Sequence, residues 1–354
     1  MKKIVLTGGG TAGHVTPNIA LIPELQKNGY EVSYIGSYEG MERHLIEELD
    51  IPYTGISTGK FRRYFSLKNF TDPFRVIKGY HEAVRALKEI KPDVVFSKGG
   101  FVSVPVVFAA SNLNIPVLIH ESDMTPGLAN KLCIPKATYV CANFPEALAS
   151  LPKEKAVLTG TPIRRELFMG SRDEGLKFTG LKGEKPVLLV TGGSLGAANV
   201  NNAVRAALPT LIKTYDIVHL CGKGKKDDSL NSTPGYVQYE YIDKEMRDIF
   251  AMADIVISRA GANAICELAS LKKPAILIPL PAHASRGDQI LNANSFEKQG
   301  FAKVLPEEEI TTDKLISTVN RVYENRDTYI SAMKKSSQAD SIGIIIDLIG
   351  KAAK

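Results

Sequence analysis

The chain has 354 residues, of which 44% are hydrophobic and 23% are charged. This length is typical of two domains of ordinary size, and the composition excludes a disordered protein. The net charge of +6 is a mild basic bias, which favours phosphorylated ligands or an anionic membrane surface.

The predicted elements begin with a strand over Lys3–Thr7 and a helix over Val15–Lys27. Gly29 ends that helix, and Glu31–Ile35 is predicted to form the next strand. Apolar strands and helices then alternate through EIKPDVVFSKGG, LNIPVLIHE, MADIVISRAGA and LKKPAILIPL. This alternation predicts an α/β fold with a parallel sheet, which binds ligands beyond the carboxyl ends of its strands. The candidate binding loops therefore follow Thr7, Phe96, Ile119, Val190, Ile257 and Ile278.

The same start, a strand followed by a glycine turn and a helix, occurs twice in the chain. It occurs at VLTGGGTAGHVTPN, from Val5, and at LVTGGSLGAANVNNA, from Leu189. Two such starts predict two doubly wound, Rossmann-like domains, over residues 1–160 and 161–340. Their boundary is expected near Gly160–Arg164, where glycine and proline occur together. Residues 341–354 are predicted to contain a last helix, over Ser341–Ala353, which closes the second domain or packs back on the first.

The first loop has the G-x-G-x-x-G pattern at Gly8, Gly10 and Gly13. A nicotinamide dinucleotide site would need an acidic residue at the end of the second strand, where Gly36 and Ser37 stand instead. The backbone N–H groups and the dipole of the following helix favour an anion at this loop. A purely structural turn is the alternative.

His14 lies at the start of this helix. A lone histidine is usually a hydrogen-bonded polar residue, but at this position it can accept a proton from a bound hydroxyl. The positive end of the helix is expected to lower the pKa of the imidazole and keep it neutral. The segments SKGGFVS (97–103) and HESDMTPGLANK (120–131) follow two further strands, and the second places Glu121 at a strand end. Each can be an ordinary loop, but three such loops at one rim favour a binding pocket.

The second half offers polar groups of the kind that bind a sugar nucleotide. TGGSLGAANVNN presents Ser194 and backbone amides to a phosphate, and SRAGANAICELA places Glu267 about two turns into a helix. A carboxylate there can accept two hydrogen bonds from ribose hydroxyls, although an isolated helix glutamate is usually solvated. HASRGDQILNAN supplies Asp288, Gln289 and Asn292, which suit sugar hydroxyls.

The segment Gly59–Tyr80 interleaves aromatic and basic residues. They are Phe61, Tyr64, Phe65, Phe70 and Phe74 with Lys60, Arg62, Arg63, Lys68, Arg75 and Lys78. The pattern fits a helix with a packed face and a charged face. It also fits an anionic membrane surface, where each basic residue contributes about 1 kcal/mol. We predict no binding of nucleic acid, because no recognisable nucleic-acid-binding motif accompanies the segment.

The four cysteines, Cys133, Cys141, Cys221 and Cys266, have neither metal-ligand spacing nor a disulfide pattern, which fits the reducing cytoplasm. The N-terminus has too few apolar residues for a signal peptide, and no apolar run approaches the roughly 20 residues of a membrane span. We predict that no metal and no cofactor are needed. The chain lacks an Asp-x-Asp pair at a strand end, and helix N-termini can stabilise a leaving diphosphate.

Together, these motifs resemble the MurG family of peptidoglycan glycosyltransferases, glycosyltransferase family 28. The resemblance covers essentially the whole chain through GGTAGHVTP, KGGFVS, HESD, GLANK, GTPIRREL, TGGSLGA, SRAGANAICELA and DQILNA. It implies a GT-B fold, in which two Rossmann-like domains face each other across a cleft. It also implies that GlcNAc is transferred, with inversion, from UDP-GlcNAc to the C4 hydroxyl of MurNAc in lipid I, which forms lipid II. Attachment to the cytoplasmic side of the cell membrane, as a peripheral protein through Lys60–Lys78, is implied as well.

The resemblance also implies which residues bind the two substrates. The implied donor site consists of Thr11, Ala12, Gly13, Asp123, Arg164, Ser194, Ile242, Ala262, Asn263, Ala264, Ile265, Cys266, Glu267 and Gln289. Within it, Glu267 is expected to hold the ribose, Ser194 and the amides near Gly261–Ala264 the diphosphate, and Gln289 the sugar. The acceptor diphosphate is expected at Gly9, Gly10, Gly99 and Gly100, with His14 and Glu121 beside it as the catalytic residues. Three positions depart from the usual family pattern, namely Ala12, Asp123 and Asp288.

Three other functions fit parts of the pattern. Another GT-B enzyme that acts on a UDP-sugar, such as a glycolipid glycosyltransferase or a UDP-GlcNAc 2-epimerase, is the main alternative. An epimerase has no use for a lipid-facing segment, which disfavours it. A nicotinamide oxidoreductase lacks its acidic residue, and a non-catalytic sugar-nucleotide sensor would not need His14 and Glu121 at the same rim.

Overall fold

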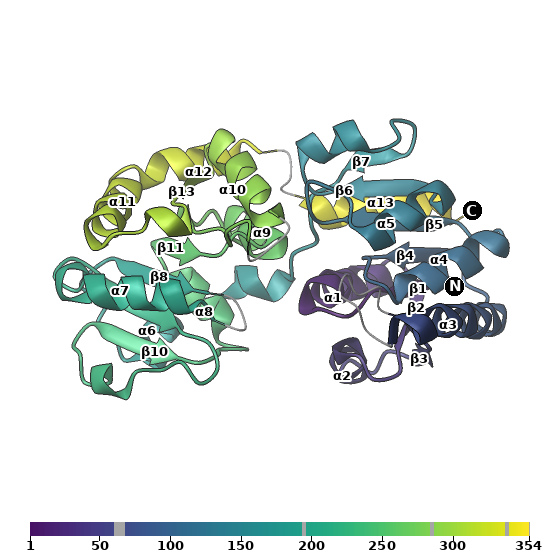
Figure 1. Cartoon of the computed structure of the whole chain (residues 1–354), viewed down its shortest axis with the longest axis horizontal. Coiled ribbons are helices and arrows are strands. Elements are labelled where there is room, and N and C mark those ends of the chain that lie inside the picture. The colour runs from purple at the N-terminus through teal and green to yellow at the C-terminus, as the bar shows by residue number, and fades with distance from the viewer. Residues whose placement is uncertain (60–67, 193–195, 284–286, 337–339, 354) are drawn as a thin grey trace. The chain divides into compact units, whose positions relative to one another are not determined.

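The computed structural model describes residues 1–59, 68–192, 196–283, 287–336 and 340–353. The chain forms two compact units, shown in Figure 1. The first comprises Met1–Arg164 together with Asp340–Lys354, and the second comprises Arg165–Ala339. Among the described residues, none of the helices combines the length and the apolar character that crossing a membrane requires.

The first unit is built on a parallel seven-stranded sheet with the order β3-β2-β1-β4-β5-β6-β7. Its strands are β1 (Lys2–Thr7), β2 (Tyr30–Ser37), β3 (Tyr53–Ile56), β4 (Val94–Ser97), β5 (Val117–Glu121), β6 (Tyr139–Ala142) and β7 (Ala156–Leu158). Every residue of β4 and β5 is buried, as expected for central strands of a parallel sheet that helices cover on both faces. The predicted α/β alternation is confirmed.

The helices of the first unit include the last helix of the chain. They are α1 (Ala12–Lys27), α2 (Met41–Glu47), α3 (Lys68–Ile90), α4 (Ser103–Asn112), α5 (Leu128–Cys133) and α13 (Ser341–Ala352), with short 3-10 turns at Ile134–Lys136 and Pro145–Ser150. Helix α13 packs against α1, and its buried Ile345 and Ile349 join the core formed with β1, β2 and β4. The hydroxyl of Ser341 donates a hydrogen bond of 2.7 Å to the carbonyl oxygen of Thr161. Of the two placements that the sequence allowed for this helix, the structure has the one on the first unit.

The second unit repeats the architecture with a parallel six-stranded sheet of order β10-β9-β8-β11-β12-β13. The strands are β8 (Val187–Thr191), β9 (Asp216–Leu220), β10 (Tyr236–Tyr239), β11 (Ile255–Ser258), β12 (Ala275–Leu277) and β13 (Ala302–Val304). The helices are α6 (Arg172–Thr179), α7 (Ala198–Leu211), α8 (Met246–Met252), α9 (Ala262–Ser270), α10 (Asp288–Lys298), α11 (Thr312–Glu324) and α12 (Arg326–Lys334), with 3-10 turns at Arg165–Met169, Asp228–Leu230 and Glu307–Glu309.

Each sheet has one point at which the strand order reverses, between β1 and β4 in the first and between β8 and β11 in the second. Open α/β sheets bind ligands at such points, beyond the carboxyl ends of the strands. The glycine loops that follow β1 and β4 flank the first reversal point. The loops that follow β8 and β11 flank the second. Four of the predicted binding loops therefore lie where this fold class places its ligands.

Candidate active site

The two glycine loops of the first unit pack directly on each other. A Cβ atom added to Gly100 would lie 2.3 Å from the carbonyl oxygen of Gly9, and Gly100 has a φ of +85°. Only glycine tolerates both the contact and the dihedral angle. Gly9 and Gly99 are buried, whereas Gly10 is exposed and Gly100 partly exposed. The two loops are therefore in contact, and of the four glycines predicted to bind the acceptor diphosphate Gly10 and Gly100 reach solvent.

His14 lies on the first turn of α1, which begins at Ala12 rather than at the predicted Val15 because the extended Thr11 is its N-cap. The Thr11 hydroxyl lies 3.2 Å from Nδ1 of His14, and the backbone N–H of His14 donates to the Thr11 carbonyl. When Nδ1–H donates to this hydroxyl, Nε2 carries the lone pair that a general base needs. Gly13, between them in the chain, is partly buried.

The pKa of His14 is lowered from 6.5 to about 4, so the imidazole is neutral at pH 7. Burial is the largest cause, the positive charge of Lys98 is the next, and the negative charge of Glu42 acts in the opposite direction. The direction of the shift agrees with the sequence-based prediction. The cause differs: burial and the charge of Lys98 lower the pKa, whereas the sequence-based prediction relied on the helix dipole.

Glu42 and Lys98 are buried charges that the sequence patterns did not single out. Glu42 lies beneath the first loop, where its Oε2 accepts a hydrogen bond of 3.2 Å from the N–H of Gly10. Lys98 follows β4, and its ammonium group donates to Nδ1 of His120, at 2.8 Å, and to the hydroxyl of Ser122. A charged residue beside glycines usually indicates a solvated turn, so only tertiary structure shows that these two are buried.

His120 completes the contacts of Lys98. Because Nδ1 accepts from the ammonium group, Nε2 carries the proton and donates it to the carbonyl oxygen of Gly160, at 2.8 Å. Burial and the charge of Lys98 hold the pKa of His120 well below its usual range. The neutral imidazole therefore connects the loop after β4 to the chain that follows β7.

Glu121 ends β5 with a carboxylate whose two oxygens are occupied by its own loop. Oε1 accepts from the N–H of Asp123, at 2.9 Å, and Oε2 accepts from the N–H of Gly127 and the side-chain amide of Asn130, at 3.1 and 2.8 Å. Burial raises the pKa of the carboxyl, and these hydrogen bonds offset part of the shift. The arrangement fits a residue that shapes the 122–127 loop better than one that takes a proton from a substrate.

Arg164 is the last residue of the first segment of unit one and is partly buried. Its Nε is buried and has no hydrogen-bond partner within the part of the chain that the structure describes. A buried donor of this kind is normally satisfied by a protein group, water or a ligand. An unpaired Nε–H is what we would expect if Arg164 contacts UDP-GlcNAc, as the resemblance implies.

In the second unit, Ser194 lies outside the described residues. The nearby Gly196, which has a φ of +66°, passes so close to the chain after β9 that an added Cβ would lie 2.1 Å from the carbonyl oxygen of Cys221. Ile242, three residues beyond β10, is buried beside the exposed Tyr241. On α10, Oε1 of Gln289 accepts a hydrogen bond of 3.1 Å from the N–H of Leu280, which leaves its amide nitrogen as the donor for a ligand.

Helix α9 divides the predicted donor residues between two faces. Asn263, Ala264 and Glu267 are partly exposed, whereas Ile265 and Cys266 are buried. The spacing of three and four residues places the first three on one face of the helix. The N–H of Ile265 is bonded to the carbonyl of Gly261, so Ile265 has neither an exposed side chain nor an available amide. The side chains of Ile265 and Cys266 therefore pack in the core, whereas Glu267 lies on the partly exposed face of α9.

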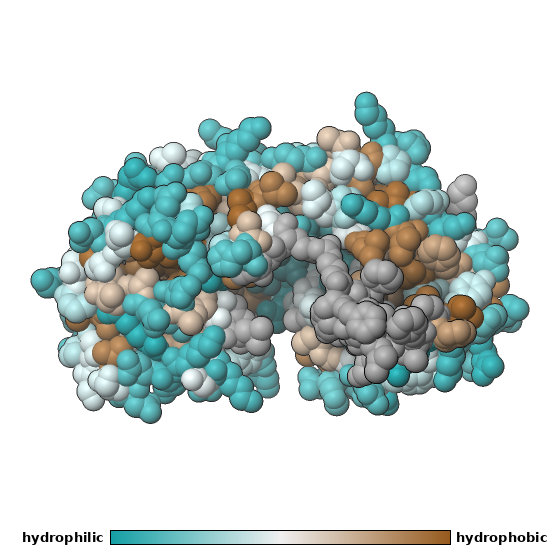
Figure 2. All heavy atoms as spheres, viewed as in Figure 1, coloured by the Kyte–Doolittle hydropathy of each residue, from teal (hydrophilic) through white to brown (hydrophobic). Residues whose placement is uncertain are grey.

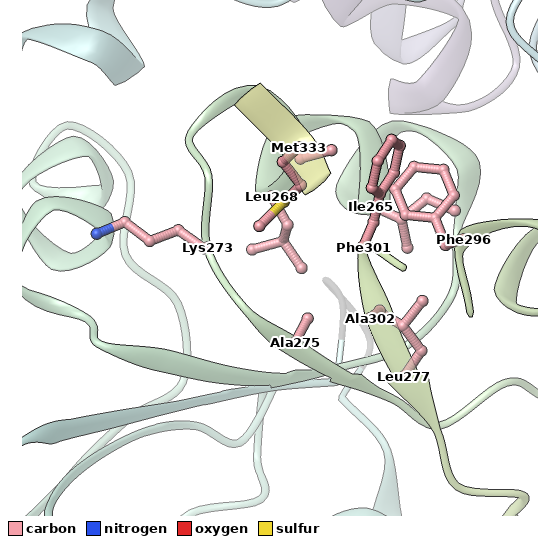
Figure 3. Close-up of a pocket in the computed structure, with 10 residues that line it drawn as sticks. Ile265, Leu268, Lys273, Ala275, Leu277, Phe296, Phe301, Ala302 and Met333 are labelled. Atoms are coloured by element: carbon pink, nitrogen blue, oxygen red, sulfur yellow. The ribbon is translucent and has the colours of Figure 1, made fainter. Parts of the chain in front are cut away.

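The inner face of α9 lines the apolar pocket shown in Figure 3, with Ile265 and Leu268 facing Phe296, Phe301 and Met333. The pocket has no room for a water molecule and, among its lining residues, a single polar side chain, Lys273. That ammonium group donates to the carbonyl oxygen of Ala253, at 2.8 Å. A ligand pocket would be larger and would combine several polar groups. This apolar packing instead fixes the position of α9 and therefore of Glu267.

Arg259 fixes the loop before α9. Its guanidinium donates to the carbonyl oxygens of Ile278 and Pro279, at 3.1 and 3.3 Å, and forms an ion pair with Glu307. It therefore ties the loop after β11 to the loop after β12. Among the described residues, no group of three or more His, Cys, Asp or Glu side chains is placed to hold a metal ion.

The sequence matches two domain families over most of its length. The glycosyltransferase family 28 N-terminal domain matches residues 4–142, and the glycosyltransferase family 28 C-terminal domain matches residues 187–345. A protein from Lachnoclostridium phytofermentans is 65% identical over 349 residues, which are 99% of this chain and 98% of that protein. It is named UDP-N-acetylglucosamine--N-acetylmuramyl-(pentapeptide) pyrophosphoryl-undecaprenol N-acetylglucosamine transferase.

Solved structures share the fold. MurG from Acinetobacter baumannii has a TM-score of 0.78 at 28% identity, over 99% of this chain and 100% of that chain. The UDP-GlcNAc 2-epimerase from Neisseria meningitidis, bound to UDP-GlcNAc, has a TM-score of 0.70 at 18% identity, over 99% and 100% of the two chains. At that identity the epimerase shows the GT-B fold alone. The chain therefore belongs to glycosyltransferase family 28 and, within it, to the MurG family.

Proposed function

We propose that this glycosyltransferase moves GlcNAc from UDP-GlcNAc to the C4 hydroxyl of MurNAc in lipid I and so forms lipid II. The observation that carries the proposal is the full-length similarity to proteins named for this transfer, at 65% identity. The two reversal points are also consistent with the proposal, because the glycine-containing loops and helices that follow such strands would supply the anion sites that two diphosphate substrates require.

In the second unit, the first-turn amides of α9 would bind the diphosphate of UDP-GlcNAc, because the first N–H groups of a helix have no partner within it. Glu267, farther along the same face, would accept hydrogen bonds from the ribose hydroxyls. The amide nitrogen of Gln289 would donate to the sugar. Ser194 and Ile242 complete the proposed donor site, with Thr11, Ala12, Gly13, Asp123 and Arg164 from the first unit.

In the first unit, the two loops that contain Gly9, Gly10, Gly99 and Gly100 would receive the diphosphate of lipid I. The C4 hydroxyl oxygen attacks C1 of GlcNAc as the bond from C1 to the UDP oxygen breaks, which inverts the configuration. Nε2 of His14 accepts the hydroxyl proton, and UDP leaves with the bond electrons. Glu121 holds the neighbouring loop, because both of its oxygens are already hydrogen-bonded there.

The proposed transferase and the epimerase alternative differ in whether their products depend on an acceptor. With UDP-GlcNAc alone, an epimerase produces UDP-ManNAc, whereas the proposed transferase releases UDP only when a lipid I analogue is added. UDP release and sugar stereochemistry, followed by chromatography with and without the analogue, distinguish the two. Formation of UDP-ManNAc without acceptor would assign the chain to the epimerase class.

The pKa of His14 predicts where activity is lost in acid. A general base must be deprotonated, so kcat/KM is expected to fall tenfold per pH unit only below about pH 4. Because the folded pKa lies below 6.5, the unfolded chain binds more protons, and stability decreases as the pH falls from about 6.5 to about 4. A pH–rate profile, with circular dichroism at each pH to separate unfolding, measures both. If kcat/KM of the folded enzyme already fell below about pH 6.5, the assignment of His14 as a general base with a lowered pKa would be contradicted.

We propose further that the first unit docks on the cytoplasmic face of the cell membrane. The described part of the aromatic and basic segment supports this, because Phe74 is 74% exposed and Ile77 is 56% exposed, with Arg75 and Lys78 also exposed on α3. Residues 60–67 of the segment lie outside the described residues. Exposed Leu128 and Leu132 on α5 add apolar surface, and Figure 2 shows hydrophobic residues gathered around α5 on this unit.

Replacing Phe74 and Ile77 together with serine is expected to weaken binding to vesicles that contain anionic phospholipid by about tenfold or more. Each apolar side chain contributes about 1.5–3 kcal/mol when fully buried, and 1.4 kcal/mol corresponds to a factor of ten. Co-sedimentation at low and high salt measures the effect. Phe168→Ser, at an exposed site in the second unit, is the matched control. Equal co-sedimentation of the double variant and the wild type would rule out this docking surface.

A further inference from the structure

Glu42 is a buried carboxylate that the proposed reaction does not use. Its side chain is completely buried and lies in α2, beneath the first glycine loop. A buried carboxylate is strongly unfavourable unless it is hydrogen-bonded or paired. Oε2 accepts from the N–H of Gly10, at 3.2 Å, and Oε1 accepts from the N–H and the hydroxyl of Ser37, at 3.1 and 2.5 Å. Both oxygens therefore connect the loop after β1 to the end of β2.

The carboxylate fills the space beside two glycines. A Cβ atom on Gly9 would lie 2.5 Å from Oε1 of Glu42, and a Cβ atom on Gly40 would lie 2.1 Å from the same oxygen. Ser37 is held in turn by the hydroxyl of Tyr53, which donates to its carbonyl oxygen at 2.5 Å. A side chain at position 9 or 40 would therefore displace the carboxylate from its present position.

The hydrogen bond to Gly10 restricts how the loop can bind an anion. Once this N–H points at the carboxylate, it is not available to a phosphate oxygen. The diphosphate must then be bound by amides other than that of Gly10, on the side of the loop away from Glu42. The hydrogen bond from Gly10 to Glu42 also fixes the residue that precedes Thr11. The hydroxyl of Thr11 in turn contacts His14.

We propose that Glu42 is a positioning residue that fixes the acceptor loop and thereby the location of His14. The inference deepens the proposed function and rests on it for the catalytic consequence. His14 also lies near one other buried charge, Lys98 beyond β4, and near the neutral hydroxyl of Thr11 in its own loop. Glu42 and Lys98 act on the imidazole with opposite signs.

The test compares Glu42→Gln with Glu47→Gln, an exposed position on the same helix. Glutamine keeps the shape of the side chain but turns one acceptor into a donor, which then faces the N–H of Gly10 or of Ser37. We expect kcat to fall by about 100-fold, as for a misplacement of about 1 Å in a catalytic group. The affinity for UDP-GlcNAc should fall by a much smaller factor, because most of the proposed donor site lies in the second unit. Glu47→Gln should leave both quantities as in the wild type.

A second readout needs no substrate. It tests whether the charges of Glu42 and Lys98 lie close to His14 in the folded protein. In an NMR titration of the His14 imidazole, Glu42→Gln removes a negative charge and should shift the midpoint to lower pH. Lys98→Met removes a positive charge and should shift it to higher pH. If Glu42→Gln fails to fold, Ser37→Ala, which deletes only the hydroxyl donor, is expected to lower kcat by a smaller factor in the same direction.

The possible outcomes are distinguishable. Wild-type kcat and an unchanged His14 titration in folded Glu42→Gln would overturn the inference. If the wild-type enzyme does not transfer GlcNAc but Glu42→Gln still shifts the His14 titration, the proposed function is rejected while the proximity of Glu42 to His14 stands. Equal losses of kcat and of UDP-GlcNAc affinity would also overturn it, because most of the proposed donor site lies in the second unit.

Discussion

Replacing His14 with alanine is expected to lower kcat by about 10²–10⁴-fold, the usual effect of losing a general base, with little change in the affinity for UDP-GlcNAc. The physical reason is that His14 is neutral at pH 7 and lies on the first turn of α1, directly beyond the glycine loop proposed to bind the acceptor. Steady-state kinetics with saturating donor and a lipid I analogue measure kcat, and calorimetry measures donor binding. His44→Ala, at an exposed position of the same unit, is the matched control.

The comparison with Glu121 decides between the two candidates for the base. Glu121→Ala is expected to act mainly through the 122–127 loop, which loses three hydrogen bonds, and so to raise KM for the acceptor. If His14→Ala kept near-normal kcat while Glu121→Ala lost it, the base would be Glu121. If neither change affected kcat, the proposed mechanism would be wrong.

Replacing Glu267 with alanine is expected to weaken UDP binding by about 1.5–3 kcal/mol, the range for hydrogen bonds to a charged group. This corresponds to a factor of about 10–150 in Kd. Glu267 lies on the partly exposed face of α9, with Asn263 and Ala264, while the opposite face packs against Phe296 and Met333. The helix should therefore keep its position when the carboxylate is removed.

Isothermal titration calorimetry with UDP measures this effect. Glu324→Ala, at an exposed position of α11, is the control for loss of a surface carboxylate in the second unit. Glu267→Gln retains one acceptor oxygen and should give an intermediate Kd. If Glu267→Ala bound UDP as tightly as the wild type, the proposed contact between Glu267 and the ribose would be wrong.

The parts of the site that depend on local chain geometry were predictable from the sequence. Apolar strands that end in glycine loops define the carboxyl edge of a parallel sheet, so the positions of the loops after Thr7 and Ile257 follow from the pattern. Such a pattern also predicts that His14 begins a helix, although the N-cap at Thr11 moves the start of that helix to Ala12.

The parts that depend on packing between distant segments were not predictable. Glu42 is separated from Gly10 by a helix and a strand, and nothing local indicates that its carboxylate is buried against that loop. The resemblance includes Ile265 and Cys266 in the donor site, and only the orientation of α9 shows that both of their side chains are buried. The last helix has the same apolar pattern whichever domain it joins, and only Ile345 and Ile349 in the first core show which one it is.

The most direct test of the central claim is transfer of labelled sugar. The purified protein is incubated with UDP-GlcNAc radiolabelled in the sugar and a lipid I analogue, and the lipid fraction is separated and counted. We predict that label moves to the analogue as a disaccharide with a β1,4 bond, in proportion to UDP released, and that His14→Ala slows this transfer. Absence of label from the lipid fraction, in a protein that is folded and binds UDP-GlcNAc, would contradict the proposed function.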